Sequence, residues 1–409
     1  MLIRKANKKT RGIFLLSNPN FIINFALILL IKTKHFYIIM KKIFSLLSAA
    51  MMLAACSNNP KQDSKVTVTE PILKEKFKNN FLIGTVLAAD QAFGRDSLTI
   101  NIAKKHFNAL TAENCMKPEI IDKEKGKYDF SEGDLVVDFA KKNNMYMIGH
   151  VLIWHEQSPK WFWVDEHGNP LKPEVMKQNM KEFITATVEH YKGKVDAWDV
   201  VNETFNDDGT LRETPYYKIL GEEYLKLAFQ YAHEADPDAK LIFNDYNVSK
   251  PEKCDAIIKK INELKSQGCQ IDYVGMQMHS TMTFPTIEQL ETSLKKFEDN
   301  GIKVQITEFD LTAIPFPEGN TADITAKADY KDTYDPYRNG LTDSARNALN
   351  NRFNDIFECF VRHSANIERV TVWGITDKGS WRQDWPIKGR TDFPTLFYSD
   401  GKMKEFLCK

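Results

Sequence analysis

Short apolar runs alternate with amphipathic, helix-like segments along the chain from Phe81 onward. The runs are rich in β-branched and aromatic residues, which is typical of buried parallel strands. They cover Phe81–Val86, Ala109–Ala112, Tyr146–Trp154, Ala197–Val201, Lys240–Phe243, Tyr273–Met278, Lys303–Thr307 and Val370–Ile375. Several helix-like segments begin at proline or at a small polar residue, as helices do. They include Pro173–Tyr191, Glu222–Ala235, Pro251–Ser266, Thr286–Asn300 and Ser344–His363.

Eight strands with intervening helices and no long linker predict an α/β fold, a single (β/α)8 TIM barrel over residues 71–409. An open, doubly wound sheet is the structural alternative. That fold normally carries a glycine-rich turn after a strand. The chain contains no G-x-G-x-x-G sequence, and we therefore expect the barrel.

Polar and aromatic residues gather where these strands end. In a (β/α)8 barrel the carboxyl ends of all strands meet at one face, where active sites are built. A single polar residue there would mean little, but nearly every strand is followed by several. They are Glu113, Asn114, Lys117, His150, Trp154, Gln157, Asn202, Glu203, Asn244–Asn247, Gln277, His279, Glu308, Asp310, Trp373, Asp377 and Trp381. The sequence therefore predicts a functional site on this face.

Glu203 and Glu308 are the natural pair of carboxyl groups for glycoside hydrolysis. That chemistry needs an acid for the leaving oxygen and a second carboxylate at the anomeric carbon. Aromatic rings suit the apolar faces of sugars, and amide, His and Lys groups suit their hydroxyls. The plainer interpretations are a solvated loop start for Asn202–Glu203 and a salt-bridged strand end for Glu308. For Trp161 and Trp198, packing in the core is an equal alternative.

The motifs at the strand ends closely resemble glycoside hydrolase family 10, which consists mainly of endo-β-1,4-xylanases on a (β/α)8 barrel. The resemblance extends in order from about Pro71 to the end of the chain. It is carried by Thr111-Ala-Glu-Asn-Cys-Met-Lys-Pro118, Gly149-His150 through Trp154-His155, Trp198-Asp-Val-Val-Asn-Glu203, Gln277-Met-His279, Ile306-Thr-Glu308-Phe-Asp310, and Trp373-Gly with Asp377 and Trp381.

By this resemblance, Glu203 matches the acid/base and Glu308 the nucleophile of a retaining double displacement. Residues that match the glycone-side binding set are Glu113, Asn114, Lys117, His150, Trp154 and Gln157. Residues that match those around the sugar being cleaved are Asn202, Gln277, His279, Trp373 and Trp381, with Asp310 orienting His279 toward Glu308. Glu203 should then have a raised pKa, with the charge of Glu308 supplying part of the rise.

The resemblance implies no metal and no organic cofactor. The expected partner is xylan or xylo-oligosaccharides, and the expected state is a monomer. Phe309 and Glu156 depart from the usual pattern but replace neither carboxyl. The long segment 311–342 after the seventh strand is expected to form a lid or wall over the site. The carboxyl end leaves room only for a helix over 402–407, which predicts either a weaker closure of the barrel or a trimmed end.

Two other functions fit parts of this pattern. Another retaining β-glycanase, acting on glucan or mannan, would keep the barrel and both glutamates. A non-catalytic glycan-binding lipoprotein would keep the aromatic residues but would have no need of both carboxyls. His155-Glu156 does not begin the H-E-x-x-H sequence of a metallopeptidase.

The amino terminus is predicted to be targeting sequence. Met40-Lys41-Lys42 starts a basic segment, an apolar run follows, and Leu53-Ala54-Ala55-Cys56 resembles a bacterial lipoprotein cleavage box. Residues 40–55 would be the signal peptide, Cys56 the lipidated residue and 56–70 a flexible tether. Residues 1–39 would be an over-extended start. The expected location is the bacterial cell envelope, on its surface or in the periplasm, with the anchor in the membrane.

Charge and cysteine content narrow the choice of partners. The chain has 55 basic and 55 acidic residues, and the first 55 positions hold nine basic and no acidic ones. The remainder is therefore mildly acidic, which argues against a nucleic-acid partner. With Cys56 acylated, five cysteines remain of six, so at least one has no intramolecular disulfide partner. Their spacing matches no zinc-binding pattern.

Overall fold

The computed structural model describes residues 70–317, 325 and 327–408. Its strands are β1 (Leu82–Leu87), β2 (Ala109–Ala112), β3 (Tyr146–Ile153), β4 (Ala197–Asn202), β5 (Lys240–Asp245), β6 (Tyr273–Met276), β7 (His279–Thr281), β8 (Lys303–Thr312) and β9 (Ile367–Val372). Their order is β6-β5-β4-β3-β2-β1-β9-β8-β7, and β6 also pairs with β8. Eight parallel strands therefore close into a barrel, to which β7 adds beside the end of β8. The predicted (β/α)8 barrel is confirmed.

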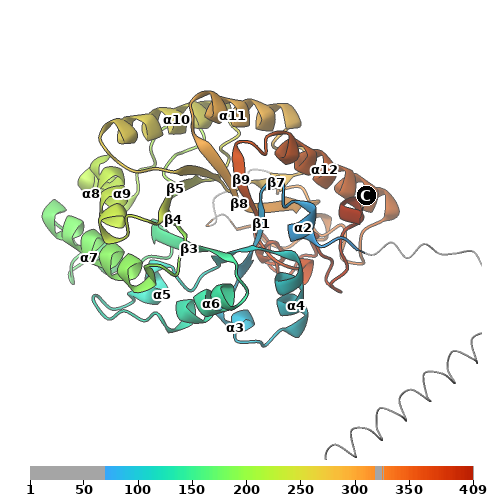
Figure 1. Ribbon diagram of the computed structural model, residues 1–409, viewed down its shortest axis with the longest axis horizontal. Coiled ribbons are helices and arrows are strands. Elements are labelled where there is room, and N and C mark those ends of the chain that lie inside the picture. The colour runs from blue at the N-terminus through green and yellow to red at the C-terminus, as the bar shows by residue number, and fades with distance from the viewer. Residues whose placement is uncertain (1–69, 318–324, 326, 409) are drawn as a thin grey trace, which may run out of the picture. The chain divides into compact units, whose positions relative to one another are not determined.

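Helices surround the strands in a ring (Figure 1). They are α2 (Leu73–Lys76), α3 (Ala89–Ala92), α4 (Ser97–His106), α5 (Pro118–Ile121), α6 (Ser131–Lys142), α7 (Pro173–Tyr191), α8 (Pro215–Leu220), α9 (Glu223–Ala235), α10 (Pro251–Ser266), α11 (Ile287–Asp299) and α12 (Asp343–Arg362). In the described part of the chain, no helix has the length and apolar character needed to cross a membrane.

Alternate strand residues build two layers of core. One set packs between the strands and the helices and includes Trp198, which is 1% exposed. The other set comes from five adjacent strands and fills the barrel: Ala109, Ile148, Ala197, Ile242 and Tyr273. Gly149 has no side chain because a Cβ atom there would lie 2.2 Å from the ring of Trp198. Trp198 is therefore a packing residue.

Most strand boundaries differ from the sequence prediction by one or two residues, and those of β8 and β9 differ most. The last strand begins at Ile367 and ends at Val372, rather than covering Val370–Ile375. The charged pair Glu368-Arg369 interrupts the apolar pattern at the start of this strand. Glu368 is exposed, whereas Arg369 is buried and donates to Gln305 at 3.0 and 2.7 Å.

The sixth strand ends earlier than predicted, and the seventh predicted strand, which is β8, extends further than predicted. β6 ends at Met276, and the chain resumes as β7 after Met278, which has a φ of +56°. β8 extends to Thr312 instead of ending at Thr307. Glu308 and Asp310 therefore lie inside a paired strand, whose backbone fixes their direction more tightly than a loop would.

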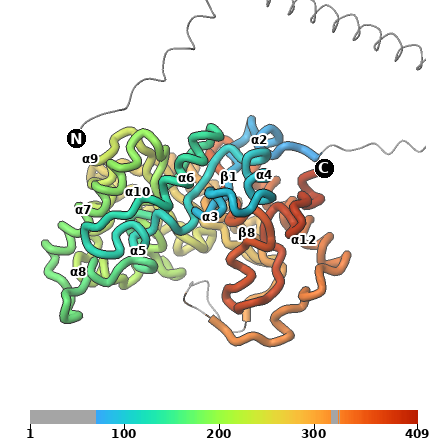
Figure 2. Tube along the Cα trace, turned by 90° about the horizontal axis from the view of Figure 1, so that it is seen from below, coloured from blue at the N-terminus to red at the C-terminus, as the bar shows by residue number. Residues whose placement is uncertain are grey.

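The segment after β8 packs against the segment after β9, and both extend from the same side of the barrel (Figure 2). The backbone N–H of Ala328 donates to the carbonyl of Pro386 at 2.9 Å, and that of Thr391 donates to Asp335 at 2.9 Å. The described residues of 311–342 thus pack against the segment after β9, and those from Thr312 to Phe316 line the cleft beside His279. The described part of 311–342 also includes a short 3₁₀ turn, η2 (Asp332–Tyr334).

The carboxyl end forms a 3₁₀ turn, η5 (Glu405–Cys408), rather than the expected helix over 402–407. It does not weaken closure, since β1 pairs in register with both β2 and β9. Lys404 ties this end to the barrel: its Nζ lies 2.9 Å from both carboxylate oxygens of Asp377, and both side chains are buried.

Replacing Lys404 with Met should reduce the free energy of unfolding by about 3–5 kcal/mol, because it leaves Asp377 buried without its counter-ion. Urea unfolding measures the change. Lys402→Met is the matched control, since that ammonium group is exposed and pairs with Asp400; it should unfold like the unmodified protein. Equal stability of the two variants would contradict a structural role for this ion pair.

Candidate active site

A chain of amide groups connects Glu203 and Glu308. Gln277 Nε2 donates to Oε1 of Glu203 at 3.3 Å and to Oδ1 of Asn202 at 3.1 Å. Asn244 Nδ2 donates to the same Asn202 oxygen and to Oε1 of Glu308, both at 2.8 Å. The residues come from β4, β5, the turn after β6, and β8, so only the closed barrel brings them together.

The orientation of these amides is determined by their partners. Thr307 Oγ1 donates to Oδ1 of Asn244 at 2.7 Å, which turns the Nδ2 of Asn244 toward Glu308. The side-chain oxygen Oδ1 of Asn202 accepts hydrogen bonds from Asn244 and Gln277. The Nδ2 group of Asn202 can therefore donate to another group. Glu203 lies just past β4 with a φ of +56°, a left-handed conformation that is uncommon for residues other than glycine.

His279 supports Glu308 from the other side. Its Nε2 lies 3.2 Å from Oε2 of Glu308, and its Nδ1 lies 2.9 Å from Oδ2 of Asp310. Asp310 also accepts from Arg382 at 3.0 and 2.8 Å and from Trp381 Nε1 at 2.8 Å. Burial lowers the pKa of His279, but the charge of Asp310 and hydrogen bonds to both carboxylates raise it to about 9. His279 is therefore protonated at neutral pH and donates from both nitrogens.

Asp310 stays ionised despite its burial. Burial acts to raise its pKa, but the Arg382 charge and the His279 charge and hydrogen bond outweigh this and lower the pKa to about 2.

The two glutamates differ in their proton affinity. Burial raises the pKa of Glu203 to about 7, the charges of Asp245 and then Glu308 add to the rise, and hydrogen bonds from Gln277 and Trp154 oppose it. Burial alone would also raise the pKa of Glu308. The hydrogen bond from His279, the influence of His150 and the donor Asn244 outweigh it, so the pKa of Glu308 is lowered.

Residues after β2 and β3 line the adjoining part of the site. Lys117 Nζ donates to Asn114 at 2.7 Å and to Gln157 at 2.6 Å, and it lies 4.9 Å from the ring centroid of Trp154. Trp154 Nε1 donates to Oε2 of Glu203 at 3.1 Å. These side chains therefore form one connected group with the acid Glu203.

Glu113 and His150 lie at the same end of the barrel. Burial raises the pKa of Glu113, against the charge of Lys117. His150 lies 2.8 Å from Asp199 and packs edge-on to Trp373 at 5.4 Å between ring centroids. The predicted catalytic and sugar-binding residues thus lie at the same end of the barrel, whereas Asp377, also selected from the sequence, pairs with Lys404.

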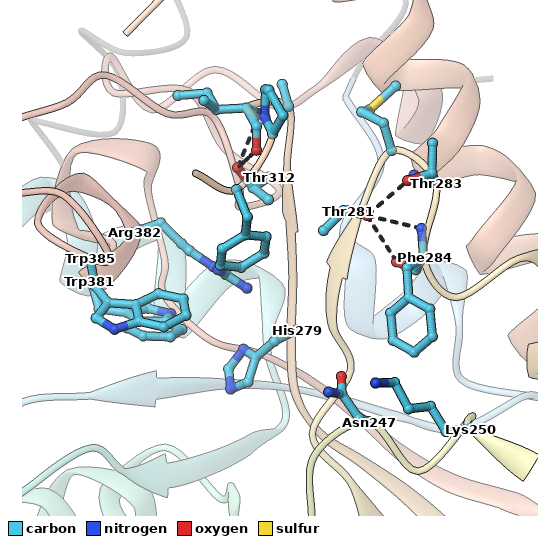
Figure 3. A pocket seen from close by; sticks show the side chains of 15 residues that line it. Asn247, Lys250, His279, Thr281, Thr283, Phe284, Thr312, Trp381, Arg382 and Trp385 are labelled. Atoms are coloured by element: carbon cyan, nitrogen blue, oxygen red, sulfur yellow. Dashed lines mark hydrogen bonds between the residues drawn. The ribbon is translucent and has the colours of Figure 1, made fainter. Parts of the chain in front are cut away.

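A cleft of about 490 Å³ opens next to His279. Figure 3 shows the stacked Trp381 and Trp385 on one side and Phe284 with Lys250 on the other. The two indole rings are 4.6 Å apart at their centroids. Further apolar lining comes from the start of the segment after β8, namely Ile314, Pro315 and Phe316.

Residues 72–408 match the family profile described as glycosyl hydrolase family 10. The chain belongs to this family. It is 41% identical over 340 residues to endo-1,4-beta-xylanase A of Xylanibacter ruminicola, covering 83% of this chain and 92% of that protein. It is 38% identical over 356 residues to a beta-1,4-xylanase of Dictyoglomus thermophilum, covering 87% and 94%.

Solved structures agree with this family membership. A GH10 endoxylanase retrieved from a sugarcane soil metagenome superposes with a TM-score of 0.79 at 38% identity, covering 82% of this chain and 99% of that one. Xylanase B from Clostridium stercorarium F9 gives a TM-score of 0.73 at 32% identity, with coverage of 82% and 98%.

No role was predicted from the sequence for Asn244 and Arg382, which both belong to this family 10 site. Asn244 lies next to the last residue of β5 and pairs with Asn202 of β4. Its place near the strand end was visible from the sequence, but its two hydrogen-bond acceptors were not. Arg382 follows Trp381 in a 3₁₀ turn, η4 (Trp381–Gln383), and no spacing pattern pointed to Asp310 as its partner. Trp161 stacks on Phe162 and donates to a backbone carbonyl, which is a packing role.

A potential metal-ligand group lies away from the cleft. Among the described residues, Glu291, Cys359 and His363 place one ligand atom each within 4.8 Å of one another, on α11 and at the end of α12. Arg362 already donates to Glu291, at 3.0 Å from its Nε. The five cysteines from Cys115 to Cys408 are all free thiols.

The Glu308→Gln variant should have a lower pKa at Glu203, by about one unit, because it removes one of the negative charges that raise it. Burial and Asp245 remain, so the pKa should stay above that of an ordinary glutamate. A ¹³C NMR titration of labelled carboxyl groups measures this, with Glu291→Gln on the outer helix as the control. An unchanged Glu203 titration would show that the two carboxyls do not interact.

Proposed function

We propose that this chain is an endo-β-1,4-xylanase, which hydrolyses internal bonds of xylan with retention of configuration. One observation carries the proposal: two carboxyls on one hydrogen-bonded chain differ in protonation near neutral pH. Glu203 has a pKa of about 7, whereas that of Glu308 is lowered. A retaining glycosidase needs this combination of a proton donor and an ionised nucleophile. The xylanase names of the family relatives support the choice of substrate.

The reaction has two steps. The Glu308 carboxylate attacks the anomeric carbon while Glu203 gives its proton to the departing glycosidic oxygen. Glu203 is then a carboxylate and takes a proton from water, whose oxygen displaces Glu308 from the sugar. Both carboxyls return to their starting states.

Neighbouring groups assist the two carboxyls. The protonated His279 keeps Glu308 ionised and directed. The Nδ2 of Asn202 is the donor that we assign to the sugar 2-hydroxyl, because its carbonyl oxygen is already occupied by two donors. That hydrogen bond strengthens in the transition state.

The two sides of the site suit the two parts of the substrate. On the glycone side, we assign sugar hydroxyls to Glu113, Asn114, Lys117, His150 and Gln157 and a ring face to Trp154. We assign Trp373 and Trp381 to the sugar being cleaved. The cleft beyond His279, with its aromatic walls, is suited to the leaving part of the chain (Figure 3).

Replacing Glu308 with Gln should reduce xylan turnover by about 10⁴-fold or more, because no nucleophile remains. Glu203→Gln should slow xylan far more than an aryl xylobioside, whose phenolate leaves without a proton. Reducing-sugar release is the measurement, with Glu291→Gln as the control. Substantial xylan turnover by the Glu308 variant would refute the nucleophile assignment.

The same assay separates the alternative functions. Release of sugar from cellulose or mannan at rates above those on xylan would indicate another β-glycanase. Tight binding of xylan without any release of sugar would indicate a glycan-binding protein. Such a protein does not need one protonated and one ionised carboxyl group.

We also propose that the enzyme is a lipoprotein of the bacterial cell envelope. The supporting observation is Leu53-Ala54-Ala55-Cys56 after a basic start and an apolar run. Residues 40–55 would be the signal, Cys56 the lipidated residue and 56–70 the tether to the catalytic domain 71–409. The residues up to 69 lie outside the described part of the chain, as does the over-extended start proposed for 1–39.

Cys56→Ser should move the full-length protein from the detergent phase to the aqueous phase of Triton X-114 extracts, because it removes the acylated thiol. The protein is produced in a bacterium that processes lipoproteins. Cys408→Ser changes another cysteine and should leave the partition unaltered. The same partition for both variants would contradict a lipid anchor at Cys56.

A further inference from the structure

Asp245 and Lys253 form a buried ion pair behind Glu203 that the two reaction steps do not use. Asp245 ends β5 and Lys253 lies in α10, and both side chains are fully buried. Lys253 Nζ is 2.8 Å from Oδ1 of Asp245 and 3.9 Å from the ring centroid of Tyr246. Buried ion pairs contribute little to stability compared with apolar residues of similar volume. Stability alone therefore does not explain why the protein buries this ion pair.

Asp245 holds the backbone that follows Glu203. Its Oδ2 accepts the N–H of Phe205 at 3.0 Å, and its Oδ1 accepts the N–H of Tyr246 at 2.9 Å. Glu203 itself has a φ of +56°, and its N–H donates to the carbonyl of Asn244 at 3.0 Å. A left-handed glutamate persists only where its surroundings hold it, and Asp245 holds the chain two residues further on.

Asp245 also places a charge behind the acid. The charged and titratable groups that act on Glu203 or respond to it come from several elements: Asp245, Tyr246, Glu308, Arg212 and Lys117. Among the carboxylates, Asp245 raises the pKa of Glu203 more than Glu308 does. Burial raises the pKa of Asp245 itself, and the charge and hydrogen bond of Lys253, the N–H of Phe205 and the charge of Arg212 reduce that rise.

The contribution of Asp245 differs from that of Glu308 during turnover. Glu308 loses its negative charge when it bonds to the sugar, whereas Asp245 forms no bond to the substrate and stays paired with Lys253. The fixed carboxylate therefore helps Glu203 to retain its proton before the first step. It also makes Glu203 a stronger base in the second step.

We propose that Asp245, held in place by Lys253, is a positioning residue for the acid/base Glu203, acting through the Phe205 backbone and through the carboxylate of its ion pair with Lys253. The proposal rests on the proposed role of Glu203 in glycoside hydrolysis.

The Asp245→Asn variant tests this proposal. Its alkaline limb in a plot of kcat/KM against pH should move about one unit lower, because an acid with a lower pKa loses its proton earlier as pH rises. Turnover of xylo-oligosaccharides should fall more than turnover of an aryl xylobioside that needs no proton. A purely structural role would slow both substrates equally and leave the limb in place.

Asp272→Asn is the matched control. Asp272 accepts the N–H of Leu241 at 2.9 Å and lies 3.3 Å from Lys240 Nζ, so it too anchors backbone beside a lysine. It does so before β6, at the opposite end of the barrel from Glu203. Its pH profile should match that of the unmodified enzyme.

A second variant keeps the test available if the unpaired lysine prevents folding. Asp245→Asn with Lys253→Met removes both charges and leaves a neutral pair of similar volume, which buried cores tolerate. Its alkaline limb should also move to lower pH. An unmoved limb in either folded variant overturns the proposal, whereas full xylan turnover by Glu203→Gln would instead overturn the assignment of the acid/base.

Discussion

Two buried carboxyls must hold different protonation states within one hydrogen-bonded chain, and most of the site follows from this constraint. Glu308 is surrounded by donors: Asn244 on one oxygen and the protonated His279 on the other. Among the described residues, the neighbours of Glu203 include carboxylates, and its donors are the indole N–H of Trp154 and the amide N–H of Gln277. The asymmetry arises from the partners, because both side chains are of the same type and burial acts to raise the pKa of both.

The asymmetry extends outward through successive partners. His279 can remain charged because Asp310 is ionised, and Asp310 can remain ionised because Arg382 donates to it twice. Each buried charge is thus compensated by the next, which limits the cost of burying it. The same arrangement recurs at Asp245 with Lys253 and at Asp377 with Lys404, both after strand ends on this face.

The backbone at this face is held in conformations that most residues avoid. Glu203, Gln157 and Met278 all have positive φ values. Glu203 directly follows β4, Met278 lies between β6 and β7, and Gln157 lies in the loop after β3. Such conformations persist where hydrogen bonds on both sides hold them. The barrel provides these bonds through neighbouring strands, so the strain stays local to the chain segments that direct side chains into the site.

The sequence by itself determined the strands, the helices and the two glutamates, because hydrophobic periodicity and strand-end motifs are properties of neighbouring residues. Its ordered motifs also predicted which residues bind sugar, and that assignment stays a prediction. The resemblance assigned the proton to Glu203, but tertiary structure alone decided which donors meet each carboxyl and so gives the physical reason for that assignment. Those donors come from other strands, as with Asn244 for Glu308 and Gln277 for Glu203. Arg369 shows the same limit in the fold: the predicted strand began only at Val370, whereas the structure includes Arg369 in β9, where it donates to Gln305 on the adjacent strand.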